Sequence, residues 1–386
     1  MSKIKILYIV FDFYQAGAER QTYEIDRAID KSKYSTSILC LKDNAYVDDV
    51  WNTAYYNKKH FDLGTKIVFF DQFKPKELLF NKALRWFERS FLGRKNKDFN
   101  SKLIPFLNQF DIIHWMGEYT FLHGLPSQIM TKSLVTTMSA KFQNLNIYHC
   151  FKFDLHYNFT SGYSEDERKY EFSEFKHYTH WFLPLLFKVP FKKNKWKFID
   201  SVGKKIGIFT RLDYYKPLNP FFLAFQKLRV VLPNVELHIF GNGDPEKAGI
   251  NDTLKKLNII ESVVFRGHQN DIIETIIKEH IDVSWFQGYN NNRPAGFAGF
   301  DVCSTGTPLI CWDFKENPTL PFSAIYPHYQ SVDKFVEKTI EVLTNKGYAE
   351  ELSNRQFNDI IENRDIDKNM HFVVSAYQGV LAQQNV

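Results

Sequence analysis

The sequence predicts an α/β protein with two Rossmann-like domains facing a cleft. The first reason is length, because 386 residues suffice for two domains of roughly 150 residues each. The second is that short β-rich runs alternate twice with helical stretches, which favours parallel sheets with crossover helices. The third is a lysine-rich stretch between the two alternations. We expect an N-terminal domain over 1–185, a basic linker over 186–205 and a C-terminal domain over 206–386. We leave open whether the last helix returns to the N-terminal domain.

The N-terminal domain is expected to contain parallel strands joined by helices. Its clearest helix spans 18–29, where Thr22, Ile25 and Ile29 recur at helical spacing. Residues 151–185 are aromatic and polar without a clean period, so we assign no element there. The β-rich runs that predict strands are 4–11, 36–41, 66–70, 111–114 and 133–138.

The C-terminal domain repeats the alternation. The runs that predict strands are 206–210, 235–240, 263–266, 282–285 and 307–312. The stretches that predict helices are 220–231, 252–257, 271–279, 297–304 and 332–343, with further helix beyond. Ligands of open α/β sheets bind beyond the carboxyl ends of the strands, so the loops that follow the strands are the first places to look for a site.

Composition excludes several classes of protein. A content of 44% hydrophobic and 24% charged residues rules out a disordered or fibrous chain. No apolar run reaches the roughly 18 residues of a spanning helix, and the apolar run at 4–10 lacks a signal-peptide cleavage site. The cysteines form no CxxC pattern, which fits a reducing compartment and argues against zinc; they are Cys40, Cys150, Cys303 and Cys311. We therefore expect a soluble, cytoplasmic protein.

The net charge of +5 is concentrated in two segments. Residues 74–102 hold nine Lys/Arg and three Asp/Glu, and residues 188–205 hold seven Lys and one Asp. Leucines and aromatic residues interleave with the basic ones over 74–107, which suits an amphipathic helix on an anionic membrane surface. An ordinary surface helix is the alternative. Nucleic acid is a poorer partner, because the two patches are separate and the overall basicity is modest.

Two cations follow the first strand of the C-terminal domain. Arg211 and Lys216 lie five residues apart on the loop after 206–210. An arginine binds phosphate bidentately and a lysine binds it as a point charge, so the pair could clamp a diphosphate. Two solvated surface cations are the alternative.

Glycines mark two further candidate anion sites. Gly296-Phe297-Ala298-Gly299 opens a predicted helix that leads to Asp301, and Gly241-Asn242-Gly243 ends a predicted strand. Glycine at a helix start lets backbone N–H groups approach an anion. A simple turn is the alternative at both places.

Together and in this order, the motifs resemble the family-4 retaining glycosyltransferases of the GT-B fold. The resemblance covers most of the chain, although 45–105 and 140–200 match nothing in it. It rests on Gly17-Ala18-Glu19-Arg20, Phe110-Asp111-Ile112-Ile113-His114, Arg211 with Lys216, Leu237 to Gly243, Val264 to Gly267 and Asp301 to Ile310.

The resemblance implies that the C-terminal domain binds a nucleotide-sugar, UDP- or GDP-linked, and that the N-terminal domain binds the acceptor. Arg211 and Lys216 would hold the diphosphate, and the Gly17 loop would close over the sugar and phosphate. The remaining implied donor contacts are Gly243, Arg266, Gly267, His268, Gly296, Phe297 and Ala298.

One departure from the family concerns its pair of glutamates eight residues apart. In register, Asp301 takes the place of the second glutamate and could hold the ribose hydroxyls. Arg293 replaces the first, and an arginine cannot accept hydrogen bonds. Arg293 could bind a carboxylate on the donor sugar, as in a uronic acid, or add charge near the phosphates. A shifted register, with Arg293 bracing the loop, is the alternative.

A second departure follows the strand at 111–114. Relatives place a histidine two residues after His114, where this chain has Met116. Glu118 and His114 remain catalytic candidates, because a carboxylate there could accept the acceptor's proton or stabilise a cationic sugar. His123 is a further candidate, and a core role is the alternative for His114.

Retaining transfer in this fold is thought to need positioning and charge stabilisation more than acid–base help. We predict no required metal and no cofactor, since Asp365-Ile366-Asp367 is the only Asp-x-Asp pattern and sits in a polar helical region. The expected function is transfer of a sugar to a glycan or lipid-linked acceptor in surface polysaccharide or lipopolysaccharide synthesis at the cytoplasmic membrane face. An inactive GT-B binding partner is the alternative. A Rossmann dehydrogenase is disfavoured because residues 12–17 do not read GxGxxG.

Overall fold

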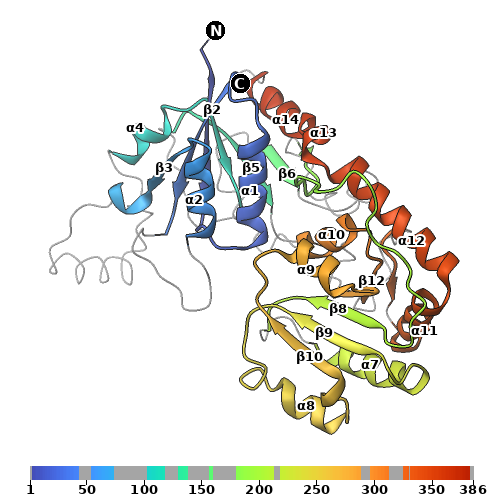
Figure 1. Cartoon of the computed structure of the whole chain (residues 1–386). Helices are drawn as coiled ribbons and strands as arrows, with labels where there is room; N and C mark the ends of the chain where they lie inside the picture. The colour runs from blue at the N-terminus through green and yellow to red at the C-terminus, as the bar shows by residue number, and fades with distance from the viewer. Residues whose placement is uncertain are drawn as a thin grey trace, which may run out of the picture. The chain divides into compact units, whose positions relative to one another are not determined.

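The computed structural model divides the chain into two compact units (Figure 1). Unit 1 contains the described residues up to 159, then 180–186 and 369–382, and unit 2 contains the described residues from 187 to 368. The structure describes residues 2–42, 54–73, 102–117, 129–137, 156–159, 180–212, 218–287, 296–312, 325–329 and 331–382.

The described strands of unit 1 form a seven-stranded parallel sheet in the order β3-β2-β1-β4-β5-β6-β7. The order reverses between β1 and β4, so this pair is the topological switch point of the sheet. The strands are β1 (Ile4–Val10), β2 (Tyr34–Cys40), β3 (Lys66–Phe69), β4 (Ile112–Trp115), β5 (Lys132–Thr137), β6 (His156–Phe159) and β7 (His180–Phe182).

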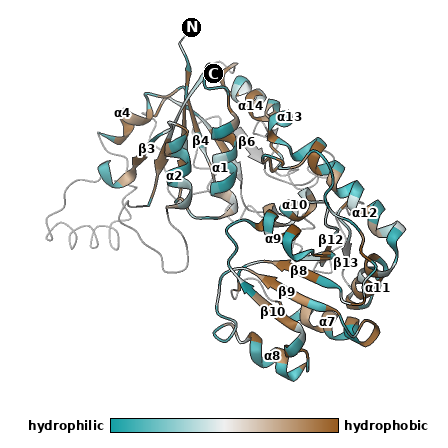
Figure 2. Cartoon of the chain, in the orientation of Figure 1, coloured by the Kyte–Doolittle hydropathy of each residue, from teal (hydrophilic) through white to brown (hydrophobic). Residues whose placement is uncertain are grey.

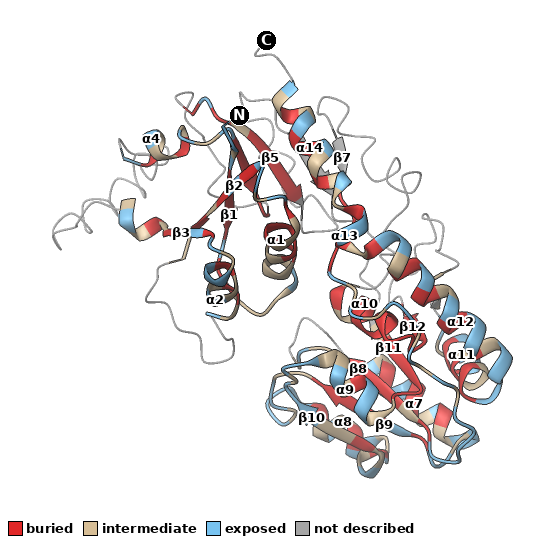
Figure 3. Ribbon diagram, turned by 45° about the horizontal axis from the view of Figure 1, so that its top comes forward, coloured by how far each residue is buried: buried red, intermediate tan, exposed pale blue. Residues whose placement is uncertain are grey.

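Helices pack on this sheet because its central strands are apolar on both sides, as expected for a parallel sheet. Residues 6–9 of β1 and residues 112–115 of β4 are buried (Figure 3). The helices of unit 1 are α1 (Gly17–Ala28), α2 (Tyr55–Asp62), α4 (Leu103–Leu107) and α14 (His371–Ala382), with a 3₁₀ turn at Phe70–Phe73.

Unit 2 is built in the same way around a parallel sheet, six-stranded in its described part, in the order β10-β9-β8-β11-β12-β13. Its switch point lies between β8 and β11. The strands are β8 (Lys205–Phe209), β9 (Glu236–Phe240), β10 (Val263–Gly267), β11 (Val283–Gln287), β12 (Leu309–Trp312) and β13 (His328–Tyr329).

The core of unit 2 is aromatic. Trp285 of β11 packs against Phe221, Phe225 and Phe335, with ring centroids 5.0–6.4 Å apart. Hydrophobic residues are frequent in β9 and in α7, which spans Asn219–Val231 (Figure 2). The helices are α7 (Asn219–Val231), α8 (Ile250–Lys256), α9 (Ile272–Glu279), α10 (Phe297–Ser304), α11 (Val332–Thr344), α12 (Lys346–Asp359), a 3₁₀ turn (Ile260–Ser262), a π-helical turn (Ile360–Arg364) and α13 (Ile366–Asn369).

The segment expected to be a linker, 186–205, is instead packed on unit 2 from Phe187 onward. The Phe187 N–H donates to the Arg364 carbonyl at 3.0 Å, and its carbonyl accepts from the Ile366 N–H at 3.0 Å. The hydrophobic side chains among its lysines are the physical reason, because Trp196 and Phe198 pack against the core of unit 2. The last helix, α14, is grouped with unit 1.

Among the described residues, no helix is long and apolar enough to cross a membrane. No three His, Cys, Asp or Glu side chains of these residues are grouped to hold a metal ion. Cys40, Cys303 and Cys311 are buried free thiols. Cys150 and residues 74–101 of the predicted amphipathic helix lie outside the described residues.

Candidate functional site

The switch point of unit 2 places Arg211 at the edge where α/β sheets bind ligands. β8 and β11 are paired at only two positions, Ile206 with Val283 and Gly207 with Ser284, near their amino ends. Arg211 is exposed and follows the carboxyl end of β8 by two residues. Lys216, and Arg293 after β11, lie outside the described residues.

Three neighbouring strand ends are joined by glycines at this edge. The Gly241 N–H after β9 donates to the Gly267 carbonyl at 2.8 Å, and the Leu212 N–H after β8 donates to the Asn242 carbonyl at 2.8 Å. A Cβ on Gly241 would lie 1.8 Å from the Thr210 carbonyl oxygen, in a backbone conformation (φ +153°) that other residues rarely adopt. Only glycine permits this approach, which fixes the backbone on both sides of Arg211.

A similar constraint applies at Gly243, whose φ is +129°. A Cβ there would lie 2.5 Å from the Leu212 carbonyl oxygen. Gly241 and Gly243 therefore allow the loop after β9 to pack closely against the loop after β8. Contact of Gly243 with a nucleoside stays a prediction.

Helix α10 begins at the same edge of the sheet, because it follows β11. Gly296 precedes it in extended backbone, and Phe297 and Ala298 form its first turn. The N-terminus of a helix carries partial positive charge and N–H groups without helical partners. Asp301, one turn further, is buried. The helix start therefore lies at the edge where the donor is expected to bind. The donor contacts of Gly296, Phe297, Ala298 and Asp301 stay predictions.

Arg266 is directed differently from the prediction. Its Nε donates to Nδ1 of His238 at 3.2 Å, and its Nη2 lies 3.1 Å from Oε2 of Glu279. Glu279 ends α9 and also pairs with Lys205, the first residue of β8. The guanidinium therefore points back toward the strand starts, away from the edge that holds Arg211.

His238 explains why Arg266 is held there. Burial lowers the pKa of His238, so the neutral ring can accept from Arg266 at Nδ1. Its other nitrogen, Nε2, lies 2.8 Å from Glu236. Gly267, the last residue of β10, and His268, the residue after it, are exposed at the carboxyl end of that strand, where a ligand contact stays a prediction.

The switch point of unit 1 brings together residues after β1. Gly17 is exposed at the start of α1, and Glu19 lies in the first turn. Burial and a hydrogen bond with Asp12 raise the pKa of Glu19 to about 8. Glu19 is therefore a neutral acid at pH 7, paired with Asp12 beyond the carboxyl end of β1. Sequence reasoning gave no role to either Glu19 or Asp12, because nothing in the spacing signals the pair.

The Glu19→Gln variant tests this protonation. Between pH 4.5 and 8 the folded protein keeps the Glu19 proton while the unfolded chain loses it, so Glu19 costs stability as pH rises through that window. Glutamine cannot ionise. We expect the variant to gain stability relative to wild type at pH 8 and not at about pH 4.5, as measured by urea unfolding. Exposed Glu261→Gln is the control, and an equal effect of both changes would contradict the assignment.

His114 is a core residue in the structure. It is fully buried at the end of β4, with Nδ1 at 2.8 Å from the Tyr377 hydroxyl and Nε2 at 2.5 Å from Oγ1 of Thr136. Burial lowers its pKa to about 3, so the ring stays neutral and ties α14 to the sheet. This geometry favours the core alternative over catalysis. Met116 is also buried, and Glu118 and His123 lie outside the described residues.

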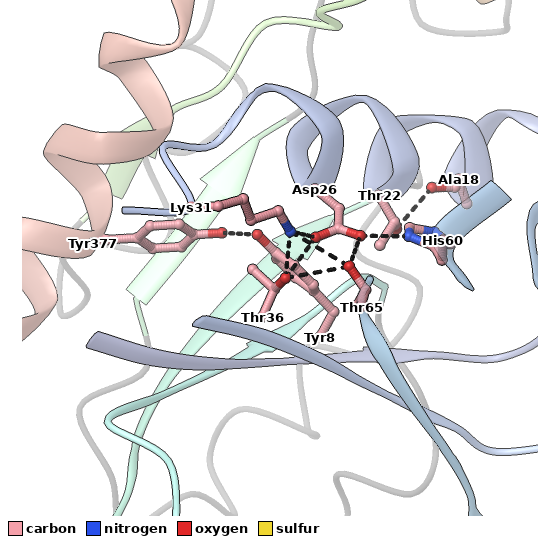
Figure 4. Close-up of polar contacts among 9 residues, drawn as sticks. All are labelled: Tyr8, Ala18, Thr22, Asp26, Lys31, Thr36, His60, Thr65 and Tyr377. Carbon is pink, nitrogen blue, oxygen red and sulfur yellow. Dashed lines mark hydrogen bonds and ion pairs between the residues drawn. The ribbon is translucent and has the colours of Figure 1, made fainter. Parts of the chain in front are cut away.

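A buried carboxylate in unit 1 was missed by sequence reasoning. Asp26, near the end of α1, accepts hydrogen bonds from Thr36 at 2.7 Å, Thr65 at 2.6 Å and His60 at 2.7 Å, and pairs with Lys31 (Figure 4). Because α1 runs back from the carboxyl edge, this network lies toward the strand starts and away from Gly17. We interpret it as structural.

Comparisons with known proteins find a likeness in structure but not in sequence. No family profile matches the chain, and no curated protein matches it at a significant level. Solved structures do match. A complex of S. aureus TarM with UDP, fondaparinux and α-GlcNAc-glycerol has a TM-score of 0.65 at 12% identity, over 98% of this chain and 100% of that one.

Two further structures match over similar lengths. Anabaena HepE, in complex with UDP and glucose, has a TM-score of 0.64 at 12% identity over 96% of this chain and 99% of that one. The lipopolysaccharide outer core galactosyltransferase WaaB has a TM-score of 0.64 at 14% identity over 97% and 99%. The fold prediction is confirmed: the chain is an α/β protein with the two Rossmann-like domains of the GT-B glycosyltransferases.

Proposed function

We propose that the chain is a retaining glycosyltransferase that moves a sugar from a nucleotide-sugar to a glycan or lipid-linked acceptor in surface polysaccharide synthesis. The position of Arg211 carries the proposal, because this exposed cation stands at the switch point of unit 2 on a backbone fixed by glycines. The GT-B fold supports it, as do the compared structures that were solved with UDP. UDP is accordingly the first nucleotide to test, and GDP the second.

In the proposed reaction, Arg211 and Lys216 hold the donor diphosphate. The bond from the anomeric carbon to the diphosphate oxygen breaks, the acceptor oxygen bonds to that carbon on the same face, and the leaving diphosphate takes the acceptor proton. The main task of the protein is then to stabilise the growing phosphate charge, to which the start of α10 adds its dipole. Asp301 would hold the ribose and Glu118 would face the acceptor. The proposal includes no metal and no cofactor.

The alternative is a GT-B protein that binds but does not transfer. Arg293 in place of a glutamate and Met116 in place of a histidine favour it, and Met116 is buried. Nucleotide binding without turnover would support this alternative. Membrane attachment through 74–107 stays a separate expectation under either function.

Turnover tests the proposal. The protein is incubated with UDP-glucose, UDP-N-acetylglucosamine, UDP-glucuronate and GDP-mannose, with glycan acceptors and with EDTA. We expect release of one nucleotide, a product with the anomeric configuration of the donor by NMR, and no effect of EDTA. An inverted product would contradict retention, and loss of activity in EDTA would contradict metal independence. Turnover of UDP-glucuronate and of no other donor would support Arg293 as a ligand of the sugar carboxylate.

A further inference from the structure

The basic segment that precedes β8 lies across the strand starts of unit 2. We name residues 188–204 the amino-edge strap. The N–H groups of Lys195 and Trp196 donate to the Thr305 carbonyl at 3.1 and 3.0 Å, shortly before β12 begins. Nε1 of Trp196 donates to the Ile281 carbonyl at 3.2 Å, just before β11. The strap therefore crosses the amino ends of β12 and β11 before it enters β8.

Three further contacts hold the strap in place. Nδ2 of Asn194 donates to Oγ of Ser353 at 2.8 Å on α12, while Oδ1 of Asn194 packs against Gly306, where a Cβ would lie 1.7 Å away. The Lys204 carbonyl accepts from the Glu236 N–H at 2.9 Å at the start of β9. The strap is thus a fixed part of unit 2, and its side chains form a defined surface.

This surface carries unneutralised positive charge. Of the lysines on the strap, Lys192, Lys193, Lys195 and Lys197 are exposed and form no ion pair with any residue that the structure describes. Asp200 is the one acidic residue of the strap.

The other charged groups at this edge already have partners. Lys204 lies 3.8 Å from Asp282, and Lys205 lies 3.7 Å from Glu279. Glu236 bonds to His238. On the adjoining α12, Glu350 and Glu351 lie 3.9 and 3.8 Å from basic groups of the same helix. Arg229, in the last turn of α7, donates to the Pro233 carbonyl at 3.3 Å and adds a further positive charge. The positive charge of the edge therefore comes from the strap lysines and Arg229.

Exposed aliphatic side chains share this edge. Ile199 and Val202 of the strap are 44% and 81% exposed, and Val230 and Val231 at the end of α7 are 84% and 56% exposed. α7 ends beside the starts of β8 and β9, as its place in the chain requires (Figure 1). Single exposed aliphatics are common, but four of them on segments of the same edge as the strap lysines give that edge a mixed apolar and basic character.

We propose that the amino edge of unit 2 docks on an anionic lipid membrane. At a membrane, burial of aliphatic side chains at the boundary of the acyl region is favourable, and lysines are attracted to the lipid phosphates. The amino edge presents both kinds of side chain. A soluble polyanion would use the lysines alone and leave the aliphatics in water. Docking by the strand starts leaves the carboxyl edge, with Arg211, open to solvent.

Sedimentation with vesicles tests the proposal. We expect the full chain to sediment with phosphatidylglycerol vesicles at low salt, less as salt rises, and not with phosphatidylcholine vesicles. Each lysine near such a surface contributes about fivefold, so Lys192→Ala/Lys193→Ala/Lys197→Ala should weaken binding about 100-fold. The matched control removes three exposed lysines of unit 1, as Lys3→Ala/Lys58→Ala/Lys66→Ala, and should bind at least tenfold more tightly than the strap variant.

The aliphatic residues separate a membrane from a polyanion. Val202→Ser/Val230→Ser, which removes the aliphatic groups without adding charge, should weaken vesicle binding at least tenfold, while retention on heparin should change far less. Vesicle binding that survives the strap variant, or falls equally in the unit 1 control, would overturn the proposal. Strong heparin retention with vesicle binding unaffected by the valine changes would favour a polyanionic partner and would also overturn it. UDP thermal shifts on the same variants report separately on the donor site.

Discussion

Replacing Arg211 with alanine is expected to weaken binding of a nucleoside diphosphate by about 10- to 150-fold. A hydrogen bond to a charged group contributes about 1.5–3 kcal/mol, which corresponds to that range in dissociation constant. The cation is the described side chain best placed for the task, because β8 ends two residues before it and the glycine contacts of Thr210 and Leu212 fix its backbone. Calorimetric titration of the wild type and the variant with UDP and GDP measures the loss.

Arg355→Ala is the matched control for this change. Arg355 is also partly exposed on unit 2, but it lies on α12 and pairs with Glu351 at 3.8 Å. We expect it to leave nucleotide affinity unchanged. If Arg211→Ala binds nucleotide as tightly as the wild type, or if both variants lose affinity equally, the diphosphate is not held by Arg211.

Asp26→Asn should destabilise the protein by about 3–5 kcal/mol. Removing one partner from a buried ion pair leaves the others without compensation, and Asp26 connects α1 to α2 through His60 and to β2 through Thr36. The buried His60 and the half-buried Lys31 would both lose the carboxylate. Urea unfolding at pH 7 measures the change. Exposed Asp30→Asn is the control and should have little effect, since Asp30 bonds only to neighbouring residues of its own turn.

The pH dependence of Asp26 gives an independent measurement. Burial alone would raise its pKa, but the hydrogen bond from His60 and the charge of Lys31 lower it from 3.8 to about 2. A carboxylate with a lowered folded pKa stabilises the fold above pH 3.8, and this contribution, about 2 kcal/mol, is lost as pH falls through about 2. Wild type should lose more stability than Asp26→Asn between pH 4 and pH 2.5. Equal losses would contradict the network.

The strands and helices of the two sheets were predictable where the pattern is strong. The helix expected at 297–304 is α10 without a shift, and the strand expected at 4–11 is β1 with one residue less. β6 and β7 were not predicted, because the aromatic and polar residues around them show no period of two. The strap was mistaken for a linker because its lysines dominate the composition, whereas Trp196 and Phe198 decide the packing.

The sequence predicted which loops form the candidate site, but it did not predict which side chains contact one another. Sequence order placed Arg211 after a strand, and the structure shows that this strand lies at the switch point. The role of Arg266 could not be read from the sequence, because the residues that hold it, His238 and Glu279, come from two other elements. The same holds for His114, whose partner Tyr377 lies 263 residues away.

Hydrogen–deuterium exchange with nucleotide tests the central claim most directly. UDP, GDP, ADP and CMP are first ranked by thermal shift, and exchange is then measured with the nucleotide that stabilises the protein most. We predict new protection at 208–212, 240–244 and the start of α10, and none at 194–204 on the opposite edge. No stabilisation by any nucleotide, or protection confined to residues outside the carboxyl edge of unit 2, would contradict a donor site at Arg211.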